Sequence, residues 1–295
     1  MNLITLPHDG IWAVVLGTMQ DAGLPHIGCT CARCSQALHD LNQAAYAACL
    51  GIVIKRGSET AVTLIDATPD IKYQLGLLAN PLGSHPTRLD RLRQPDAIFL
   101  THAHMGHIGG LPQLGPEAMA VEGLPVYAMP ALIDLLQAQT LWRPVLERLE
   151  LRPLQPEIPI AINADCTITP IRVPHRDEWN AGTLAFRIQG PQRSLLYLPD
   201  IDAWDLWPQA RSILVNVDIA LVDASFFSGN ELGGRAPVAH PLVTETLTRF
   251  ADLSTRLMLT HINHTNPILD AGGHENQIMQ AAGAELAQTG TFFQI

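Results

Sequence analysis

The amino-acid sequence predicts an α/β protein in which β-sheets pack against one another and helices lie outside them. Short runs of β-branched and aliphatic residues recur along the whole chain, and segments with helical spacing lie between many of them. The strands come in bursts instead of alternating one for one with helices. That order favours packed sheets over a single doubly wound parallel sheet.

The predicted strands are short apolar runs bounded by turn-forming or polar residues, a pattern typical of buried strands. They span 12–17, 50–56, 60–67, 97–102, 124–129, 167–173, 183–189, 194–200, 219–225, 256–261 and 291–295. The predicted helices carry apolar residues three and four positions apart, as an amphipathic helix requires. They span 69–80, 129–139, 241–252 and 276–288.

Composition indicates one domain over residues 1–295. The chain has 295 residues, of which 47% are hydrophobic, so it can bury a sizeable core, and neither a Ser/Gly-rich linker nor a block of charge divides it. The formal net charge is −10, with 18 Lys and Arg against 28 Asp and Glu. An acidic surface repels phosphate backbones, so we expect no nucleic-acid partner.

The N-terminal stretch MNLITLPHDGIWAVVLG is apolar but lacks a cationic region and a small-residue cleavage site, so it predicts opening strands and not a secretion signal. No apolar run approaches the roughly 18 residues that a membrane-spanning helix needs. Of the five cysteines, three crowd into one short segment, which does not suit an ordinary disulfide framework. We therefore expect a cytoplasmic protein without a membrane partner.

Polar residues of chemical interest follow the predicted strands at the point where each strand ends. They are Asp66, His102, His175, Asp200, Asp223 and His261. Strand ends held by a rigid sheet can bring side chains from distant segments to one point. The sequence therefore predicts a functional site at one edge of the sheets.

The segment LTHAHMGHIGG, residues 100–110, places His102, His104 and His107 at the end of a predicted strand. A pair spaced i, i+2 can present both imidazoles to one ion from a turn, and a third at i+5 can reach a neighbouring position. Neutral imidazole suits zinc, iron, manganese and nickel alike. We interpret the cluster as a metal site in preference to a chance gathering of polar loop residues.

A second candidate metal site lies in GCTCARC, where Cys29, Cys31 and Cys34 form a C-x-C-x-x-C pattern. Three thiolates this close can face one tetrahedral ion, with a fourth ligand from elsewhere in the chain. The alternative is three small buried loop residues, which is less favoured because adjacent thiols without a metal are prone to oxidation. Cys49 and Cys166 are expected in the core.

The histidine pattern resembles the H-x-H-x-D-H motif of the metallo-β-lactamase superfamily, whose fold is an αββα sandwich of two mixed β-sheets flanked by helices. The likeness extends nearly from end to end and includes LIDAT, VPHRD, LPDID and LTHINH. It implies two adjacent metal sites that share one carboxylate. The implied ligands are His102, His104 and His175 for the first site, His107 and His261 for the second site, and Asp200 for both.

The sequence departs from the motif at Gly106, which occupies the position of a second-site Asp. The loss of an anionic ligand predicts a weaker second site beside one tightly bound zinc or iron ion. Asp66 is expected to orient a ligand histidine from behind. The residues alone leave an alternative for LPDIDAW, in which Asp200 or Asp202 caps a helix. With the histidine cluster present, we favour Asp200 as a ligand.

Several stretches are most similar to the PqqB-like branch of the superfamily, which is associated with biosynthesis of pyrroloquinoline quinone. They include ATPDIKYQL, VPHRDEW, LYLPDIDAW and THINHTNPILD. The cysteine triplet also resembles that of PhnP-type phosphodiesterases, which pair it with a late histidine to hold structural zinc. This implies His264 as the fourth ligand and an N-terminal Cys-rich zinc loop. The chain differs from PqqB proteins in keeping both His102 and His104.

These observations predict a metallo-hydrolase that acts on a small-molecule ester, lactone or phosphodiester. His240, in VAHPLV, resembles a histidine that some phosphodiesterases of the superfamily use as a proton donor, although a helix start beside Pro241 also explains it. The PqqB resemblance implies the alternative of an iron-dependent oxygenase acting on a tyrosine-like precursor. A non-catalytic binding protein is less favoured because the ligands are retained. A homodimer stays an open alternative.

Overall fold

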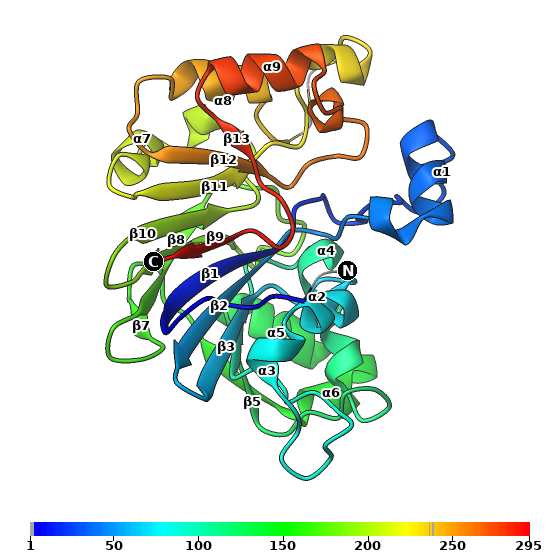
Figure 1. Cartoon of the computed structure of the whole chain (residues 1–295), viewed down its shortest axis with the longest axis vertical. Coiled ribbons are helices and arrows are strands. Elements are labelled where there is room, and N and C mark those ends of the chain that lie inside the picture. Colours follow the sequence, from blue (N-terminus) through cyan, green and yellow to red (C-terminus); the bar gives the residue numbers. More distant parts are fainter. Residues whose placement is uncertain (1–2, 236, 238) are drawn as a thin grey trace.

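In the computed structural model, which describes residues 3–235, 237 and 239–295, two β-sheets pack face to face and helices cover their outer faces (Figure 1). Within these residues each sheet has seven strands. This arrangement confirms the predicted αββα sandwich. Buried apolar residues from both sheets form one continuous cluster, so the sandwich is closed by hydrophobic packing.

The first sheet has the spatial order β14-β1-β2-β3-β4-β5-β6, with antiparallel pairing among β14, β1, β2 and β3 and parallel pairing from β3 to β6. Its strands are β1 (Gly10–Gly17), β2 (Cys49–Arg56), β3 (Glu59–Ile65), β4 (Ala97–Phe99), β5 (Leu124–Ala128), β6 (Leu149–Pro153) and β14 (Phe292–Gln294). The β1–β3 meander therefore feeds directly into the parallel part of the sheet.

The second sheet has the spatial order β13-β12-β11-β10-β9-β8-β7. Its strands are β7 (Ile160–Ala161), β8 (Thr167–Val173), β9 (Thr183–Gln189), β10 (Ser194–Leu198), β11 (Ile219–Asp223), β12 (Arg256–Thr260) and β13 (Glu285–Leu286). Strands β7 to β10 pair antiparallel, and β10 to β13 pair parallel. Both sheets thus combine an antiparallel half with a parallel half.

Most of the helices lie on the two outer sides of the sandwich. They are α1 (Ala32–His39), α2 (Ile71–Leu77), α3 (Ala79–Leu82), α4 (Met105–Ile108), α5 (Pro130–Ala138), α6 (Arg143–Leu146), α7 (Ala210–Leu214), α8 (Val243–Arg249) and α9 (His274–Ala281). Figure 1 shows α2, α3, α5 and α6 beside the first sheet, α7 to α9 beside the second, and α1 projecting from the body.

Successive residues of the central strands face two different cores. In β10, Leu195 and Tyr197 belong to the cluster that contains the first sheet, whereas Leu196 and Leu198 pack with residues of α7 and α8. Side chains alternate between the faces of a strand, so a strand covered on both faces needs apolar residues at every position. This explains the uninterrupted run SLLYL.

Strand register brings several strand ends to one edge of the sandwich. In the second sheet Leu198 of β10 pairs with Val222 of β11, and Asp223 of β11 pairs with Thr260 of β12. In the first sheet, Ile65 of β3 pairs with Phe99 of β4. Because these pairings are parallel, the loops that follow the strands leave the sheets side by side.

The predicted elements differ from the structure at boundaries and sheet edges, and the short helices α1, α4, α6 and α7 were not predicted. The predicted helix 276–288 is wrong beyond residue 281, because Gly283 turns the chain at a φ of 76° and residues 285–286 form the edge strand β13. The predicted strand 97–102 pairs only over Ala97–Phe99. The edge strands β6 and β7 were not predicted, because their sequences lack a buried apolar run.

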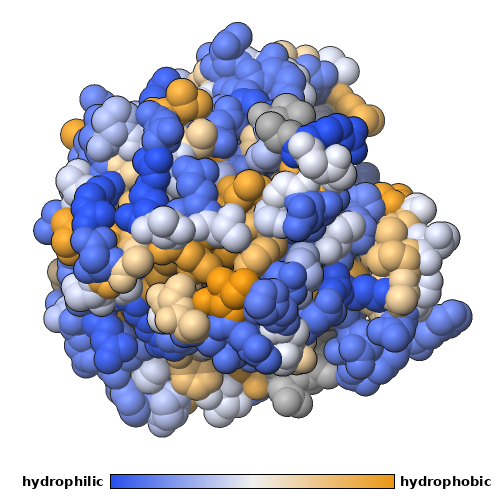
Figure 2. All heavy atoms as spheres, turned by 90° about the horizontal axis from the view of Figure 1, so that it is seen from above, coloured by the Kyte–Doolittle hydropathy of each residue, from blue (hydrophilic) through white to orange (hydrophobic). Residues whose placement is uncertain are grey.

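The outer surface over α8 and α9 is largely hydrophilic, with a smaller apolar area near the centre of the view (Figure 2). Among the described residues, no helix combines the length and apolar character needed to cross a membrane.

Candidate metal centre

The predicted strand-end residues converge at the shared edge of the two sheets. Asp66 follows β3, and the histidine segment follows β4 and continues into α4. From the second sheet, His175 follows β8 and Asp200 follows β10, while His261 directly follows β12. The site is therefore built from both sheets, and each sheet fixes its own ligand loops.

The first cluster consists of His102, His104 and His175. The Nε2 atom of His102 lies 2.9 Å from Nδ1 of His104, and Nε2 of His175 lies 3.3 Å from the same Nδ1 atom. Ligand atoms about 2.0–2.1 Å from one tetrahedral zinc ion lie roughly 3.3 Å apart. The three nitrogens therefore have the spacing of ligands around one ion.

Asp200 lies between this cluster and a second one. Its Oδ1 atom is 3.5 Å from Nε2 of His175, while its Oδ2 atom is 3.1 Å from Nε2 of His107 and 3.4 Å from Nε2 of His261. The two oxygens of one carboxylate thus face different clusters. The helix-cap alternative for Asp200 is wrong, because the next helical turn begins only after Ala203.

A residue that the sequence analysis did not identify, Asp21, completes the second cluster. Its Oδ1 atom lies 3.4 Å from Nε2 of His107 and 3.6 Å from Nε2 of His261. Asp21 lies four residues after the end of β1, farther from its strand than the residues that the strand-end pattern indicated, and a search extended a few residues beyond each strand would have included it.

The second ring nitrogen of each clustered histidine lies close to an oxygen atom. His107 Nδ1 lies 2.7 Å from Asp66 Oδ2, His175 Nδ1 lies 3.0 Å from Asp202, and His104 Nε2 lies 3.0 Å from Glu178. The Nδ1 atoms of His102 and His261 face the hydroxyls of Thr101, at 2.9 Å, and Ser225, at 3.2 Å. Contacts of this kind fix the tautomer and the orientation of a metal-binding imidazole. Asp66 thus makes the contact with a clustered histidine that the sequence predicts.

Three of the six non-glycine residues with a positive φ in the described part of the chain lie at the site. Asp66, His240 and His261 have φ values of 75°, 71° and 55°, a left-handed conformation that is uncommon for residues other than glycine. Such strain persists where the surrounding structure holds it in place, and it is typical of functional sites. Here it turns each side chain toward the cluster directly after a strand or before a helix.

The electrostatics of the first cluster favour metal binding. Burial lowers the pKa of His102 and of His175, so both imidazoles are held in the neutral form that binds metals. Burial opposes the charge of Asp200, but the imidazoles of His261 and His107 outweigh it and keep the pKa of this carboxyl well below its usual range. Asp200 is therefore held as an anion between the two clusters.

The second cluster combines two imidazoles with two carboxylates, a set of groups that suits a metal cation. Burial opposes a charge on His107, yet Asp66 and Asp200 beside it raise its pKa well above the usual value. Within the described residues, the buried atoms His107 Nε2, His261 Nε2 and Asp200 Oδ2 have no hydrogen-bond partner of suitable geometry. Buried polar atoms left in this way are costly, and a metal ion with nitrogen and oxygen ligands fits them.

His240 lies beside both clusters but is held differently. Its Nδ1 atom lies 2.7 Å from Asp223 Oδ2, and its Nε2 atom is 3.5 Å from the Gln20 amide. Burial opposes its charge, but Asp223 and Asp200 outweigh this and raise the pKa of His240 to about 9. Helix α8 is capped at Leu242, so His240 is not a helix-capping residue.

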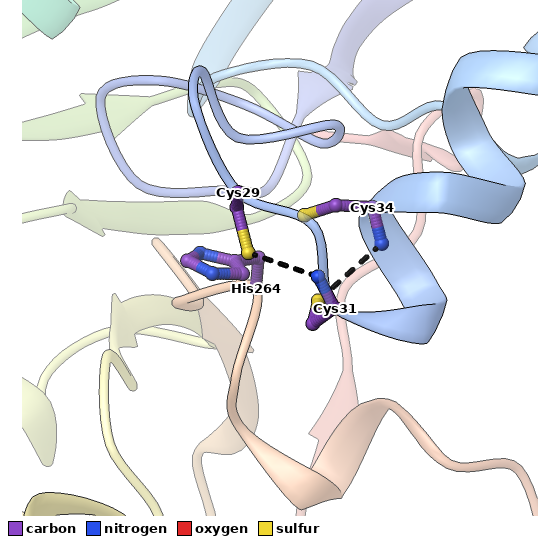
Figure 3. A group of neighbouring side chains, drawn as sticks. All are labelled: Cys29, Cys31, Cys34 and His264. Carbon is purple, nitrogen blue, oxygen red and sulfur yellow. Dashed lines mark hydrogen bonds between the residues drawn. The ribbon is translucent and has the colours of Figure 1, made fainter.

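The cysteine cluster forms a separate site next to α1. Figure 3 shows the thiols of Cys29, Cys31 and Cys34 gathered beside the ring of His264, and the four ligand atoms lie within 4.8 Å of one another. Backbone N–H groups donate to the sulfurs, with Cys34 N 3.5 Å from Cys31 Sγ and Cys31 N 3.5 Å from Cys29 Sγ. Three sulfurs and one nitrogen fit a structural zinc site.

The two remaining cysteines lie where the sequence predicts them, and Arg33 of α1 adds a contact beside the cysteine cluster. Cys49 and Cys166 are buried in the core, each at 1% exposure. Arg33, within the cysteine segment, donates to the backbone carbonyl of His264 and lies 2.7 Å from Asp270. The cysteine segment therefore contacts the loop after β12 in two ways, through the Arg33–Asp270 ion pair and through the approach of the thiols to His264.

Comparison with known proteins places the chain in a family. A beta-lactamase superfamily domain model matches residues 62–262, more than half of the chain, and the chain belongs to this superfamily. Coenzyme PQQ synthesis protein B of Gluconacetobacter diazotrophicus is 24% identical over 315 aligned residues, which cover 94% of this chain and 97% of that protein.

Two solved structures share the fold. Zn(2+)-bound PqqB from Methylobacterium extorquens has a TM-score of 0.79 at 20% identity, covering 96% of this chain and 100% of that one. A diphosphatase from the PhnP family has a TM-score of 0.68 at 22% identity, covering 96% of each chain. The resemblance to the superfamily and to its PqqB-like branch, expected from the sequence, is confirmed.

Proposed function

We propose that the protein is a metal-dependent hydrolase of small-molecule phosphodiesters, or of esters and lactones. The position of Asp200 carries this proposal. Its two oxygens face separate ligand clusters, 3.5 Å from His175 Nε2 on one side and 3.1 Å from His107 Nε2 on the other. A shared carboxylate between two imidazole clusters is suited to adjacent cations that hold the attacking and leaving oxygens of a hydrolysed bond.

When bound at such a site, zinc or a similar ion polarises a carbonyl or phosphoryl oxygen and lowers the pKa of a coordinated water toward about 7. The chain's own residues provide the rest. His102, His104 and His175 place their nitrogens close together, and hydrogen-bonding contacts behind the rings orient His102 and His104. Asp202 lies 3.0 Å from the second ring nitrogen of His175. The site is therefore organised before any substrate arrives.

His240 is the proposed proton donor to the leaving group. Its raised pKa keeps it protonated near neutral pH, and its contact with Asp223 fixes the ring with Nε2 directed toward the site side chain Gln20. General acid catalysis of this type contributes about 10²- to 10⁴-fold to a rate. A poor leaving group, as in an alkyl phosphodiester, needs such a donor more than a good one.

The similarity to a PhnP-family diphosphatase supports a phosphoryl substrate. Hydrolysis of bis(p-nitrophenyl) phosphate and of an alkyl phosphodiester, with metal content measured in parallel, tests the proposal. We expect turnover that does not depend on oxygen and that His102→Ala abolishes. His240→Gln should retain metal and lose about 10²-fold or more on the alkyl substrate. His274→Ala, an exposed histidine in α9, is the control.

An iron-dependent oxygenase is the second candidate function. It is supported by the relatives named for PQQ synthesis, which align over 94% of this chain. Histidine and carboxylate ligands do not distinguish zinc from iron. Iron at the first cluster in protein purified without added metal, together with oxygen uptake in the presence of a tyrosine-like compound and no hydrolysis, would replace the first proposal with this one.

A further inference from the structure

The segment that carries Asp21 packs directly against the backbone of Gly106. A Cβ atom built at Gly106 would lie 2.2 Å from Asp21 Oδ1 and 2.5 Å from the Asp21 Cα atom. Both distances are far below contact, and the second involves backbone that no side-chain rotation can move. Only glycine fits at this position because the segment after β1 lies directly against it.

The carboxylate of Asp21 lies where a fourth ligand of the second cluster is needed. The four contacts from His107 Nε2 and His261 Nε2 to Asp21 Oδ1 and Asp200 Oδ2 measure between 3.1 and 3.6 Å. Ligand atoms around one tetrahedral ion lie roughly 3.3 Å apart. The two imidazole nitrogens belong to side chains that are only 1% and 2% exposed, and they have no hydrogen-bond partner among the described residues.

The backbone of this segment is fixed to the segment that carries His261. Gln20 N donates to Ile262 O at 3.0 Å, and Ile262 N donates to Thr18 O at 2.8 Å. The Gln20 side chain also donates to the Ser225 hydroxyl at 2.9 Å, the group that faces His261 Nδ1. Asp21 is therefore placed by an ordered backbone and not by a free surface loop.

We propose that Asp21 replaces the motif carboxylate missing at position 106 and completes a second, four-coordinate metal site with His107, His261 and Asp200. The inference rests on the proposed metal-dependent function and replaces the expectation of a weaker second site. The ligand has moved from the histidine motif to the segment after β1. Gly106 is then a requirement of the site, since a side chain there would displace the new ligand.

The first test is a calorimetric titration of metal-depleted protein with Co²⁺ or Zn²⁺. Elemental analysis then counts the bound ions. We expect the wild type to bind two ions at the active site besides one at the cysteine cluster. Asp21→Asn should weaken only the second ion, by about 100-fold or more, beyond the 10- to 100-fold effects typical of residues behind the ligands. Asp134→Asn, which removes a carboxylate in α5, should leave all affinities unchanged.

Gly106→Ala tests the same idea without removing any ligand atom. The added methyl group displaces Asp21, so we expect the second ion to bind about 10-fold or more weakly, while the first ion is unaffected. Gly76→Ala in α2, where an added Cβ meets no atom within 4 Å, is the matched control and should bind both ions normally.

Asp21→Cys reports ligation directly. With the cysteine cluster filled by zinc beforehand, Co²⁺ added to this variant should produce a thiolate-to-cobalt absorption band that the wild type lacks. Unchanged second-ion affinity in Asp21→Asn, or no such band in Asp21→Cys, would overturn the inference and leave the first cluster and the hydrolase proposal intact. A wild type that binds no ion beyond the cysteine cluster would overturn both.

Discussion

Replacing Asp66 by Asn tests how the buried carboxylate controls a metal-binding histidine. Asp66 is completely buried and accepts from Thr101 N at 2.8 Å and from the Thr101 hydroxyl at 3.0 Å, while its Oδ2 atom lies 2.7 Å from His107 Nδ1. Asn has nearly the same shape and tolerates the φ of 75° at this position. The change therefore alters hydrogen bonding with little effect on packing.

The amide introduced by Asp66→Asn has a single acceptor oxygen, which accepts from the Thr101 N–H, so its NH₂ group faces His107. His107 Nδ1 must then accept a hydrogen bond, and the ring proton moves to Nε2, the atom directed at Asp200. A protonated Nε2 is unable to bind a metal. We expect metal affinity at the second cluster to fall about 10- to 100-fold, which corresponds to about 1.4 to 2.8 kcal/mol.

Calorimetric titration of metal-depleted Asp66→Asn with zinc measures this loss, and urea unfolding of the apoprotein measures the accompanying change in stability. Asp218→Asn is a matched control, because Asp218 also accepts from a backbone N–H and a hydroxyl, both of Ser194, but lies at the opposite ends of β10 and β11. Wild-type affinity at the second cluster of Asp66→Asn would refute the tautomer argument.

Three further substitutions test other parts of the structure. Cys31→Ser removes one thiolate of the cysteine cluster. At a free zinc concentration of about 1,000 times the Kd of the wild-type cluster, we expect urea titration to show a loss of about 4 kcal/mol in unfolding free energy. Full stability with a retained zinc ion would contradict a structural role. Asn266→Ala removes a buried amide that donates to Ala224 O at 3.0 Å and accepts from Ile268 N at 2.9 Å. Calorimetry should show destabilisation of about 2 kcal/mol or more, and a change near zero would be inconsistent with these contacts. Phe99→Ala opens a cavity in the sheet core and should cost about 3 to 5 kcal/mol by chemical unfolding, whereas a cost below about 1 kcal/mol would show that the core closes around it.

Much of the fold and of the candidate site followed from the sequence because strand ends are locally encoded. Asp200 and His261 each follow a run whose apolar pattern identifies a buried strand, and the parallel register then places them at one edge. The edge strands β6 and β7 were missed because an exposed edge imposes no apolar pattern. The helix predicted to residue 288 ends before Gly283, a helix-ending signal that the prediction passed over because the apolar spacing continues beyond it.

Asp21 shows where such reasoning reaches its limit. A glycine in the place of a motif aspartate indicates a lost ligand when only neighbouring residues are considered. Its meaning changes once the segment after β1 is known to lie against Gly106, a contact between residues far apart in sequence. Asp21 lies four residues beyond the end of β1, so the strand-end pattern did not single it out, and nothing in the sequence indicated that it would lie against Gly106.

Two short segments connect the cysteine cluster with the candidate active site. The first carries Asp21 and, a few residues later, Cys29; the second carries His261 and, three residues later, His264. The segments pair directly through Gln20 N and Ile262 O at 3.0 Å, so neither can shift without the other. A zinc ion in the cysteine cluster would link this pair of segments at its outer end, whereas His102 and His104 lie on a third segment, which follows β4. Loss of that zinc should therefore loosen the second cluster first and leave the first cluster in place.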